Sequence, residues 1–306
     1  MSRSNDTISL IEAEDFLESI LQLKFPMDRL TEDRAGFLRD VIASCHRRIP
    51  FQSVTSIATP KPERRALTFK EIKVDMMTRK GGLCCELNYF MKVLLETLGF
   101  EVDHVGCSVF GSLNSHLSTV VRNLSRPGDL HLVDIGSGYP MFDPIPLVFD
   151  KESPLYKTSF LYHKFLKDTD GTLRWVHRAY RDYYDGPPAD VVDEWYTFMV
   201  INLEVRDIKF FFPNMENIHT VESGPKALAP FLVSLRAIDY RNGRLFAVKD
   251  TTILKEDASG KVNKKRISSP QELLEAYKVH FPQFPAETVQ QAIQQVTLKF
   301  QNSSGK

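Results

Sequence analysis

The sequence predicts an α+β fold in three successive parts: an N-terminal helical bundle, an antiparallel β-barrel in the middle and an α/β portion at the end. Up to Gly99, apolar residues recur at the spacing of amphipathic helices. After Gly99 they alternate with polar residues, as in the strands of an antiparallel sheet. A capped helix returns after Ser269. We therefore place the domains at residues 1–99, 100–212 and 213–306.

The first domain is expected to hold four helices. Residues 9–12 and 68–71 have the Ser/Thr-x-x-Glu spacing of a capping box, which begins a helix. Thr31 is expected to cap a second helix that Pro50 ends, because proline cannot continue a helix. The fourth helix is expected to begin at about Cys84 and to end at a glycine, which suits a helix C-cap.

The rest of the chain contains strands separated by turn signals. Asn242-Gly243 favours a type I′ hairpin, and Pro127-Gly128 and Asp170-Gly171 mark two more turns. Residues 257–265 are polar and basic and are expected to form the solvated tip of a hairpin. The expected strands lie at residues 105–109, 116–121, 130–135, 161–166, 173–179, 195–205, 232–238 and 245–248.

Composition and charge argue against several functions. Apolar residues make up 42% of the chain and charged residues 25%, which is ordinary for a globular protein. Lys+Arg and Asp+Glu both total 39, so the chain has no net charge to attract nucleic acid or an anionic membrane. We find no export signal and no apolar stretch as long as a membrane span. The four cysteines are therefore expected to be free thiols in a cytoplasmic protein.

Gly81, Gly82 and Cys84 form the first candidate for a catalytic motif. Two glycines let the backbone turn sharply and approach a ligand closely. Cys84 follows at the start of an amphipathic helix, where unpaired N–H groups and the helix dipole favour the thiolate that attacks carbonyls. Cys85 points about 100° away around the helix and is expected to be a packing residue. The alternative is that the glycines only break the helix and that both cysteines are small core residues.

A nucleophilic cysteine needs a base, and the base needs an orienting group. His116 begins one expected strand, and Asp134 lies near the end of the next. Both are equidistant from residue 125 in the intervening loop, so their side chains are expected to lie roughly opposite each other across the hairpin. Asp134 also interrupts an apolar strand, where a carboxylate is costly unless it is paired.

Two other histidines compete for the role of the base. His104 has no matching acid, and His131 lies on the strand face opposite to that of Asp134, so both are expected to be structural or surface residues. The alternative to a catalytic pair is that His116 is an incidental strand histidine near an edge aspartate.

The motifs together resemble those of the arylamine N-acetyltransferases. Lys80-Gly81-Gly82-Leu83-Cys84 is similar to the Arg-Gly-Gly-x-Cys signature of that family, and Pro50-Phe51-Gln52 is similar to its Pro-Phe-Glu-Asn segment. His116 and residues 133–138 match the positions of the other triad members, and residues 217–225 weakly resemble the lid segment. The resemblance covers almost the whole chain. It implies helical, β-barrel and α/β lid domains around a cysteine-protease-like Cys-His-Asp arrangement.

The resemblance also implies an activity. An acetyl group would pass from acetyl-CoA to an arylamine, arylhydrazine or arylhydroxylamine in a ping-pong reaction of xenobiotic metabolism, with Cys84 acetylated in between. Cys84, His116 and Asp134 would be catalytic, no metal would be needed, and the protein is expected to be a monomer. Ser112 and Leu113 are expected beside the coenzyme. The expected acceptor-binding residues are Phe51, Leu83, Ser115, Ser137 and Tyr139.

The sequence departs from the family pattern at several positions. Lys80 stands where the family usually has arginine, and lysine cannot make the same bidentate contact with a carboxylate. Ser137 replaces a common aromatic residue, so a different acceptor preference is expected. Two other functions remain open. One is a Cys-His-Asp peptide or amide hydrolase or a transglutaminase-like enzyme, and the other is a non-catalytic relative that binds a ligand.

Overall fold

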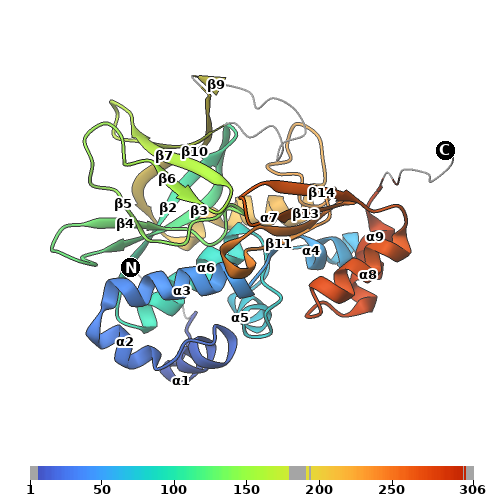
Figure 1. The fold of residues 1–306 in the computed structure, drawn as a ribbon, viewed down its shortest axis with the longest axis horizontal. Coiled ribbons are helices and arrows are strands. Elements are labelled where there is room, and N and C mark those ends of the chain that lie inside the picture. The colour runs from blue at the N-terminus through green and yellow to red at the C-terminus, as the bar shows by residue number, and fades with distance from the viewer. Residues whose placement is uncertain (1–5, 179–190, 193, 299, 301–306) are drawn as a thin grey trace.

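Helices and two antiparallel sheets share the chain in the computed structural model, which describes residues 6–178, 191–192, 194–298 and 300 (Figure 1). The N-terminal helices, blue in Figure 1, lie together below the larger sheet. The smaller sheet lies beside them, with α8 and α9 at the far end of the molecule. This is the mixed helix-and-sheet architecture that the sequence predicts.

The N-terminal part forms the expected helices with one different cap. Both predicted capping boxes, at Ser9 and Thr68, are confirmed. The prediction for Thr31 is wrong. Pro26 begins an additional helix that contains Thr31, and Asp33 caps the next helix by accepting a backbone hydrogen bond of 2.9 Å from its first turn. The helical segments are α1 (Leu10–Asp15), η1 (Phe16–Ile20), α2 (Pro26–Glu32), α3 (Arg34–Arg48), α4 (Val54–Ala58), η2 (Lys61–Glu63), α5 (Phe69–Met77) and α6 (Cys84–Thr97).

A nine-stranded antiparallel sheet forms the middle of the chain and curls into a half-barrel (Figure 1). Its order is β5-β4-β3-β2-β10-β8-β7-β6, with β9 beside β10. Within the described residues the ladder ends at β5 and β6, so the expected barrel is an open, curled sheet. Lys167 pairs with Leu173 across Asp170-Gly171, which confirms that turn. The strands are β2 (Glu101–Val109), β3 (Ser112–Arg122), β4 (Leu130–Val133), β5 (Ile145–Pro146), β6 (Tyr156–Thr158), β7 (Leu161–Lys167), β8 (Leu173–Arg178), β9 (Val191–Val192) and β10 (Trp195–Arg206).

A five-stranded sheet joins the start of the chain to its C-terminal part. β1 (Phe51–Gln52) pairs with β11 (Arg236–Asp239), and β12 (Phe246–Lys249), β13 (Thr252–Glu256) and β14 (Val262–Arg266) follow in order. The loop between β13 and β14 forms the predicted hairpin tip. In the loop between β11 and β12, Asn242 and Gly243 both have positive φ, as a type I′ turn requires. That loop runs over residues 240–245 and is longer than a two-residue hairpin.

The last helices cover the five-stranded sheet. Ser269 caps α8 as predicted. Apolar side chains of α4, α8 and α9 form one hydrophobic core with this sheet, and α4 packs against α9. The helical segments after β10 are η3 (Ile208–Phe211), α7 (Phe212–Thr220), η4 (Arg241–Gly243), α8 (Pro270–His280) and α9 (Ala286–Gln295).

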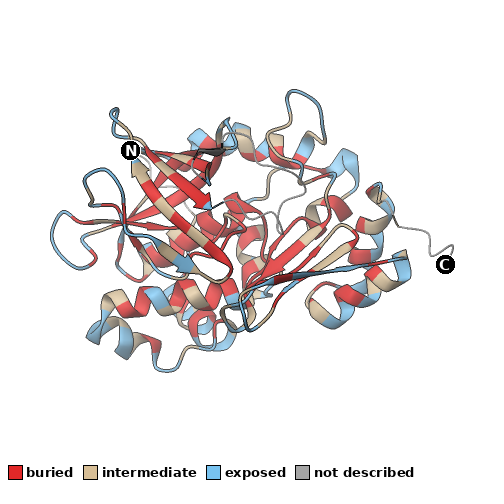
Figure 2. Ribbon diagram, turned by 45° about the horizontal axis from the view of Figure 1, so that its top comes forward, coloured by how far each residue is buried: buried red, intermediate tan, exposed pale blue. Residues whose placement is uncertain are grey.

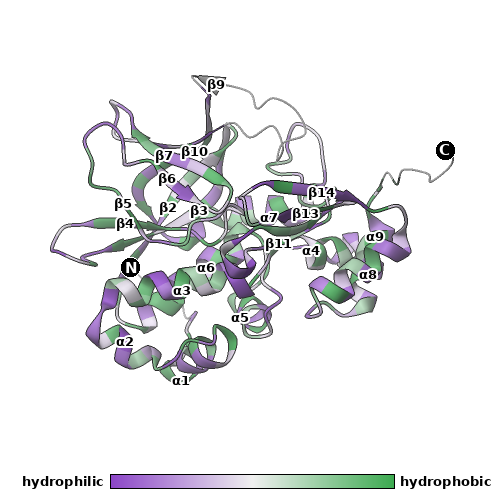
Figure 3. Ribbon diagram, viewed as in Figure 1, coloured by the Kyte–Doolittle hydropathy of each residue, from purple (hydrophilic) through white to green (hydrophobic). Residues whose placement is uncertain are grey.

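The larger hydrophobic core lies between the N-terminal helices and the curled sheet, and α6 runs through it. Buried residues accordingly gather in the middle of the molecule (Figure 2). Helices α1 to α3 carry both hydrophilic and hydrophobic residues, as expected for helices with one buried face (Figure 3). None of the helices in the described part of the chain has the length and hydrophobicity that a membrane crossing requires.

Candidate active site

The glycine pair brings Cys84 to the start of α6 beside β1. Gly81 has a φ of +68°, and a Cβ at this position would lie 2.0 Å from the carbonyl oxygen of Pro50. Glycine is therefore required here. The carbonyl of Gly82 accepts a hydrogen bond of 2.9 Å from the backbone N–H of Gln52. The Pro50-Phe51-Gln52 segment and the glycine pair, which lie before and after α5 in the sequence, are thus neighbours in space. Cys84 follows as the first residue of α6.

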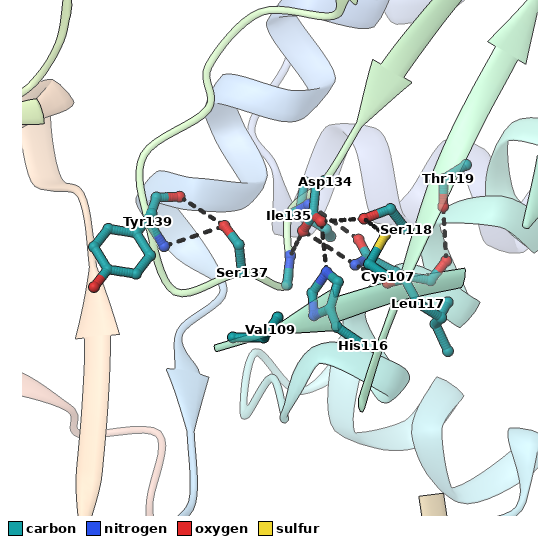
Figure 4. A network of polar contacts seen from close by, with 12 residues as sticks. Cys107, Val109, His116, Leu117, Ser118, Thr119, Asp134, Ile135, Ser137 and Tyr139 are labelled. Carbon is teal, nitrogen blue, oxygen red and sulfur yellow. Dashed lines mark hydrogen bonds and ion pairs between the residues drawn. The ribbon is translucent and has the colours of Figure 1, made fainter. Parts of the chain in front are cut away.

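His116 and Asp134 are in direct contact. His116 Nε2 lies 2.6 Å from Asp134 Oδ2, and Figure 4 shows the ring pointing from β3 toward the carboxylate. Both side chains are buried. Because Nε2 is held by Asp134, Nδ1 is the ring nitrogen left for Cys84, whose thiol interacts with His116 and raises the pKa of the ring.

The register of the β3–β4 hairpin differs slightly from the prediction. Thr119 pairs with Val133, so the hairpin is centred one residue later than expected. His116 therefore reaches Asp134 diagonally rather than directly across the ladder. The physical reason is Asp129, whose carboxylate accepts hydrogen bonds from three backbone N–H groups of the loop and so fixes where β4 begins.

Asp134 is fully buried and held by four hydrogen bonds. Besides His116, Ser118 Oγ donates to Oδ2 at 2.5 Å, while Asn88 Nδ2 and the backbone N–H of Gly136 donate to Oδ1 at 3.1 and 2.9 Å. Burial opposes the charge of Asp134, but His116 and these donors hold the pKa of the carboxyl below its usual range. The carboxylate is thus fixed in the orientation that presents Oδ2 to the imidazole.

Asn88 is a site residue that the sequence analysis missed. It lies one turn after Cys84 on α6 and joins the helix to the sheet. Its Nδ2 also donates to the carbonyl of Leu117 at 2.8 Å, and its Oδ1 accepts from the N–H of Ile135 at 3.0 Å. Gly136 packs against the same turn, where a Cβ would lie 2.8 Å from the Cα of Cys84. A polar residue four positions after the nucleophile, on the buried helix face, was the available signal.

Neighbouring groups lower the pKa of Cys84 and raise the pKa of His116. A hydrogen bond with Cys85 and the contact with His116 outweigh burial and lower the pKa of Cys84 to about 6. Burial acts against the charged form of His116, but Asp134 and Cys84 raise its pKa to about 10. These opposite shifts favour a thiolate and an imidazolium at neutral pH. This arrangement can attack a thioester or an amide carbonyl.

Known proteins share this fold. An arylamine N-acetyltransferase of Mycobacterium smegmatis superposes with a TM-score of 0.72 at 20% identity, over 92% of this chain and 97% of that one. Arylamine N-acetyltransferase 1 of Oryctolagus cuniculus is 28% identical over 130 residues, which are 40% of this chain and 44% of the relative. A family model of N-acetyltransferases matches residues 36–282. The chain belongs to the arylamine N-acetyltransferase family.

The two kinds of similarity cover different lengths. The chain spans less than half of the rabbit relative, whereas the structural likeness extends over nearly all of each chain. The arylamine N-acetyltransferase of Mycobacterium marinum in complex with CoA superposes with a TM-score of 0.69 at 16% identity, over 90% of this chain and 97% of that one. At these identities the structures establish the fold of this family member.

The first prediction concerns the Cys84 thiol of this arylamine N-acetyltransferase family member. The rate at which iodoacetamide alkylates Cys84 is expected to rise with pH through about pH 6 and then to level off, because only the thiolate reacts. A free thiol shows that rise near pH 8.5. Mass spectrometry of the labelled chain gives the rate at each pH, and buried Cys45, whose pKa burial raises, is the internal comparison. A rise of the Cys84 rate near pH 8.5 would contradict the ion pair.

Three of the expected acceptor-binding residues lie in, or pack against, the segment that follows Asp134. Ser137 and Tyr139 belong to the segment that passes the start of α6, and Ser137 Oγ contacts both the N and the O of Tyr139 at 3.2 Å. The ring of Phe51 lies 3.3 Å from the Cβ position of Gly138. Ser137, where this family usually has an aromatic residue, therefore shapes the turn through its hydroxyl. Its contact with an acceptor stays a prediction.

The other four expected contact residues lie in different surroundings. Leu83 is fully buried as the N-cap residue of α6. Ser115 Oγ accepts a hydrogen bond of 3.2 Å from the N–H of Val109 and holds the irregular pairing of β2 with β3. Ser112 begins β3, and Leu113 next to it is 74% exposed. Their contacts with acceptor or coenzyme stay predictions.

The remaining expectations concern residues around the triad. Lys80 Nζ makes one contact, 3.3 Å from Asp75 Oδ1, as expected for a lysine in place of arginine. His104 is buried against aromatic rings, and His131 lies 3.7 Å from Asp129, so both are structural residues. All four cysteines are buried free thiols. Cys85, however, is more than the expected packing residue, because its thiol donates to Glu86 Oε1 at 3.1 Å and the neighbouring thiol influences the pKa of Cys84.

Proposed function

We propose that the protein transfers an acetyl group from acetyl-CoA to the nitrogen of an arylamine, arylhydrazine or arylhydroxylamine. The observation that carries the proposal is the buried chain of contacts from Cys84 through His116 to Asp134, in a member of the arylamine N-acetyltransferase family. The likeness to a family structure in complex with CoA supports coenzyme A as the carrier of the acetyl group. Family membership favours acyl transfer over the hydrolase and transglutaminase alternatives.

In the first half-reaction the thiolate of Cys84 attacks the thioester carbonyl of acetyl-CoA. The carbon–sulfur bond to Cys84 forms, and the bond to the coenzyme sulfur breaks. The imidazolium of His116 gives its proton to the departing thiolate, so that CoA leaves as a thiol. In this scheme the oxyanion accepts hydrogen bonds from backbone N–H groups at the start of α6, that of Cys85 among them, because the first N–H groups of a helix have no intrahelical acceptor.

In the second half-reaction the acceptor nitrogen attacks the acetyl group on Cys84. Neutral His116 takes the proton from the nitrogen, and Cys84 leaves as a thiolate beside the imidazolium. Asp134 stays ionised throughout and holds the ring in one orientation. The reaction is ping-pong because acetylated Cys84 must exist before the acceptor reacts. The chain acts as a monomer in this scheme.

The proposal predicts that, without an arylamine, the protein releases about one equivalent of CoA as Cys84 is acetylated, and that continued release of CoA requires the acceptor. A thiol reagent measures the free CoA, with a panel of arylamines and hydrazines as acceptors. Without acceptor, the intact protein should gain the mass of one acetyl group, and peptide mapping should locate it on Cys84. Fast CoA release without any acetylated acceptor would indicate a thioester hydrolase, and no acetylation at all would favour a non-catalytic relative.

A further inference from the structure

A second group of buried polar side chains lies directly behind the nucleophile. Cys85 and Glu86 follow Cys84 on α6, and His219 comes from α7 in the last third of the chain. All three are buried, and none of them belongs to the triad. They connect the nucleophile to a part of the chain that is remote in sequence.

The contacts of this group form one continuous chain. His219 Nε2 lies 2.8 Å from Glu86 Oε1, and the thiol of Cys85 donates to the same oxygen at 3.1 Å. The other oxygen of Glu86 accepts the backbone N–H of Leu83 at 2.7 Å. Glu86 is therefore fixed between the helix start, the thiol of Cys85 and His219. Cys85 has one proton, and in the structure it goes to Glu86.

A carboxylate in this position acts against the proposed chemistry. A negative charge two residues from Cys84 disfavours a thiolate there, because like charges in a buried site repel. When His219 is protonated, its positive charge neutralises Glu86 and so removes this repulsion. Burial opposes the charge of His219, but Glu86 raises the pKa of His219, and His219 and Cys85 in turn keep the pKa of Glu86 below its usual range against burial.

We propose that His219 is a positioning residue, whose ion pair with Glu86 withdraws the carboxylate charge from Cys84. The inference rests on the proposed role of Cys84 as the nucleophile. It adds a residue of α7, outside the triad, to the control of that thiol. The distances among the three side chains and their burial carry the proposal.

The surroundings allow His219 to exchange its proton. Its Nδ1 lies 3.3 Å from Ser56 Oγ, and both residues line a cavity of about 470 Å³ between α4, α5 and α9. Two pairs of charges face the cavity, Arg65 with Glu71 and Lys80 with Asp75, while Arg64 pairs with Glu222 outside the lining. Among the charged groups, Glu86 has the largest effect on the pKa of His219. The titratable and charged groups around His219, Glu86 and Cys84 are Cys85, His116, Glu216, Asp75, Lys80, Glu63, Arg64, Arg65 and Glu71.

The test is the pH dependence of Cys84 alkylation in His219→Gln. Its midpoint is expected to rise by about one pH unit, because Glu86 then lacks its counter-charge. The rate at the wild-type midpoint should fall roughly fivefold, and the rates should converge at high pH, where the thiolate is complete in both proteins. His131→Gln is the matched control, since His131 is also buried beside a carboxylate but lies outside this chain of contacts. Its midpoint should not move.

A variant without the Glu86 carboxylate distinguishes an effect of its charge from an effect of its hydrogen bonds on the structure. Glu86→Gln keeps the shape but not the charge, so its midpoint should not rise, and Glu86→Gln with His219→Gln should match Glu86→Gln alone. An equal rise in Glu86→Gln would mean that the contacts act only as a scaffold and would overturn the proposal, as would a His219→Gln profile that overlays wild type. If His219→Gln does not fold, Glu86→Gln with His219→Gln is measured instead. An alkylation midpoint of this double variant above that of Glu86→Gln would refute the proposed role of His219. Acetylation of the wild type, measured separately, tests the proposed function.

Discussion

Cys84→Ala should lose acetyl transfer by at least about 10⁴-fold, because the neighbouring thiol of Cys85 has a raised pKa and is expected to be a poor nucleophile. Cys84 is the cysteine that lies at the start of a helix, contacts His116 and has a lowered pKa. The variant should keep its fold, since alanine is a good helix former and the deleted atom is small. The measurement is CoA release with an arylamine acceptor, together with the mass of the protein after treatment with acetyl-CoA.

Cys45→Ala is the matched control for this loss. Cys45 is equally buried, lies on α3, and has a pKa that burial raises, so it cannot be the nucleophile at neutral pH. Its removal should leave transfer nearly unchanged. Acetylation of Cys85 in the Cys84→Ala protein, or turnover within tenfold of wild type, would overturn the assignment.

Asp134→Asn should lower kcat by about 10³- to 10⁴-fold, the scale seen when the carboxylate of such a triad becomes an amide. The amide lacks the charge that raises the pKa of His116. It also offers one oxygen where the carboxylate offers two, so it cannot accept from Ser118, Asn88 and His116 as Asp134 does. The pKa of His116 should therefore fall, and the alkylation midpoint of Cys84 should rise.

The double variant with His116→Ala tests whether the two residues act as a unit. Since Asp134 acts through His116, adding Asp134→Asn to His116→Ala should cost little more than the histidine loss alone. Circular dichroism establishes that each variant is folded, because Asp134 is also a buried hydrogen-bond acceptor. Additive losses in kcat would show that Asp134 has a role that does not pass through the imidazole.

The sequence predicts the parts of the site that local pattern determines. Gly81 is needed for a left-handed backbone, and the expected start of the helix at Cys84 follows from it. The contact of His116 with Asp134 follows from hairpin symmetry, although Asp129 moves the centre of the hairpin by one residue. The error at Thr31 has a similar cause, because Asp33 is an equally good cap two residues later.

The hydrophobic and motif pattern of the sequence does not predict contacts between segments that are far apart along the chain. Asn88 meets Asp134 only because the curled sheet packs on α6, and no local rule relates the two positions. His219 meets Glu86 because α7 returns to the start of α6 after the whole half-barrel. Both contacts depend on the tertiary arrangement of elements, which one sequence read by periodicity does not determine.

The pairing of β1 with β11 has a consequence for how the protein is made. Phe51 pairs with Ile238, which is translated roughly 190 residues later, and closing so long a loop is slow. β1 also hydrogen-bonds to Gly82, which precedes the nucleophile. On the ribosome the helices and the curled sheet can therefore form first, while the segment before Cys84 gains its final support only once β11 has emerged. A nascent or truncated chain would carry Cys84, His116 and Asp134 without the β1–β11 pairing that supports the segment before Cys84.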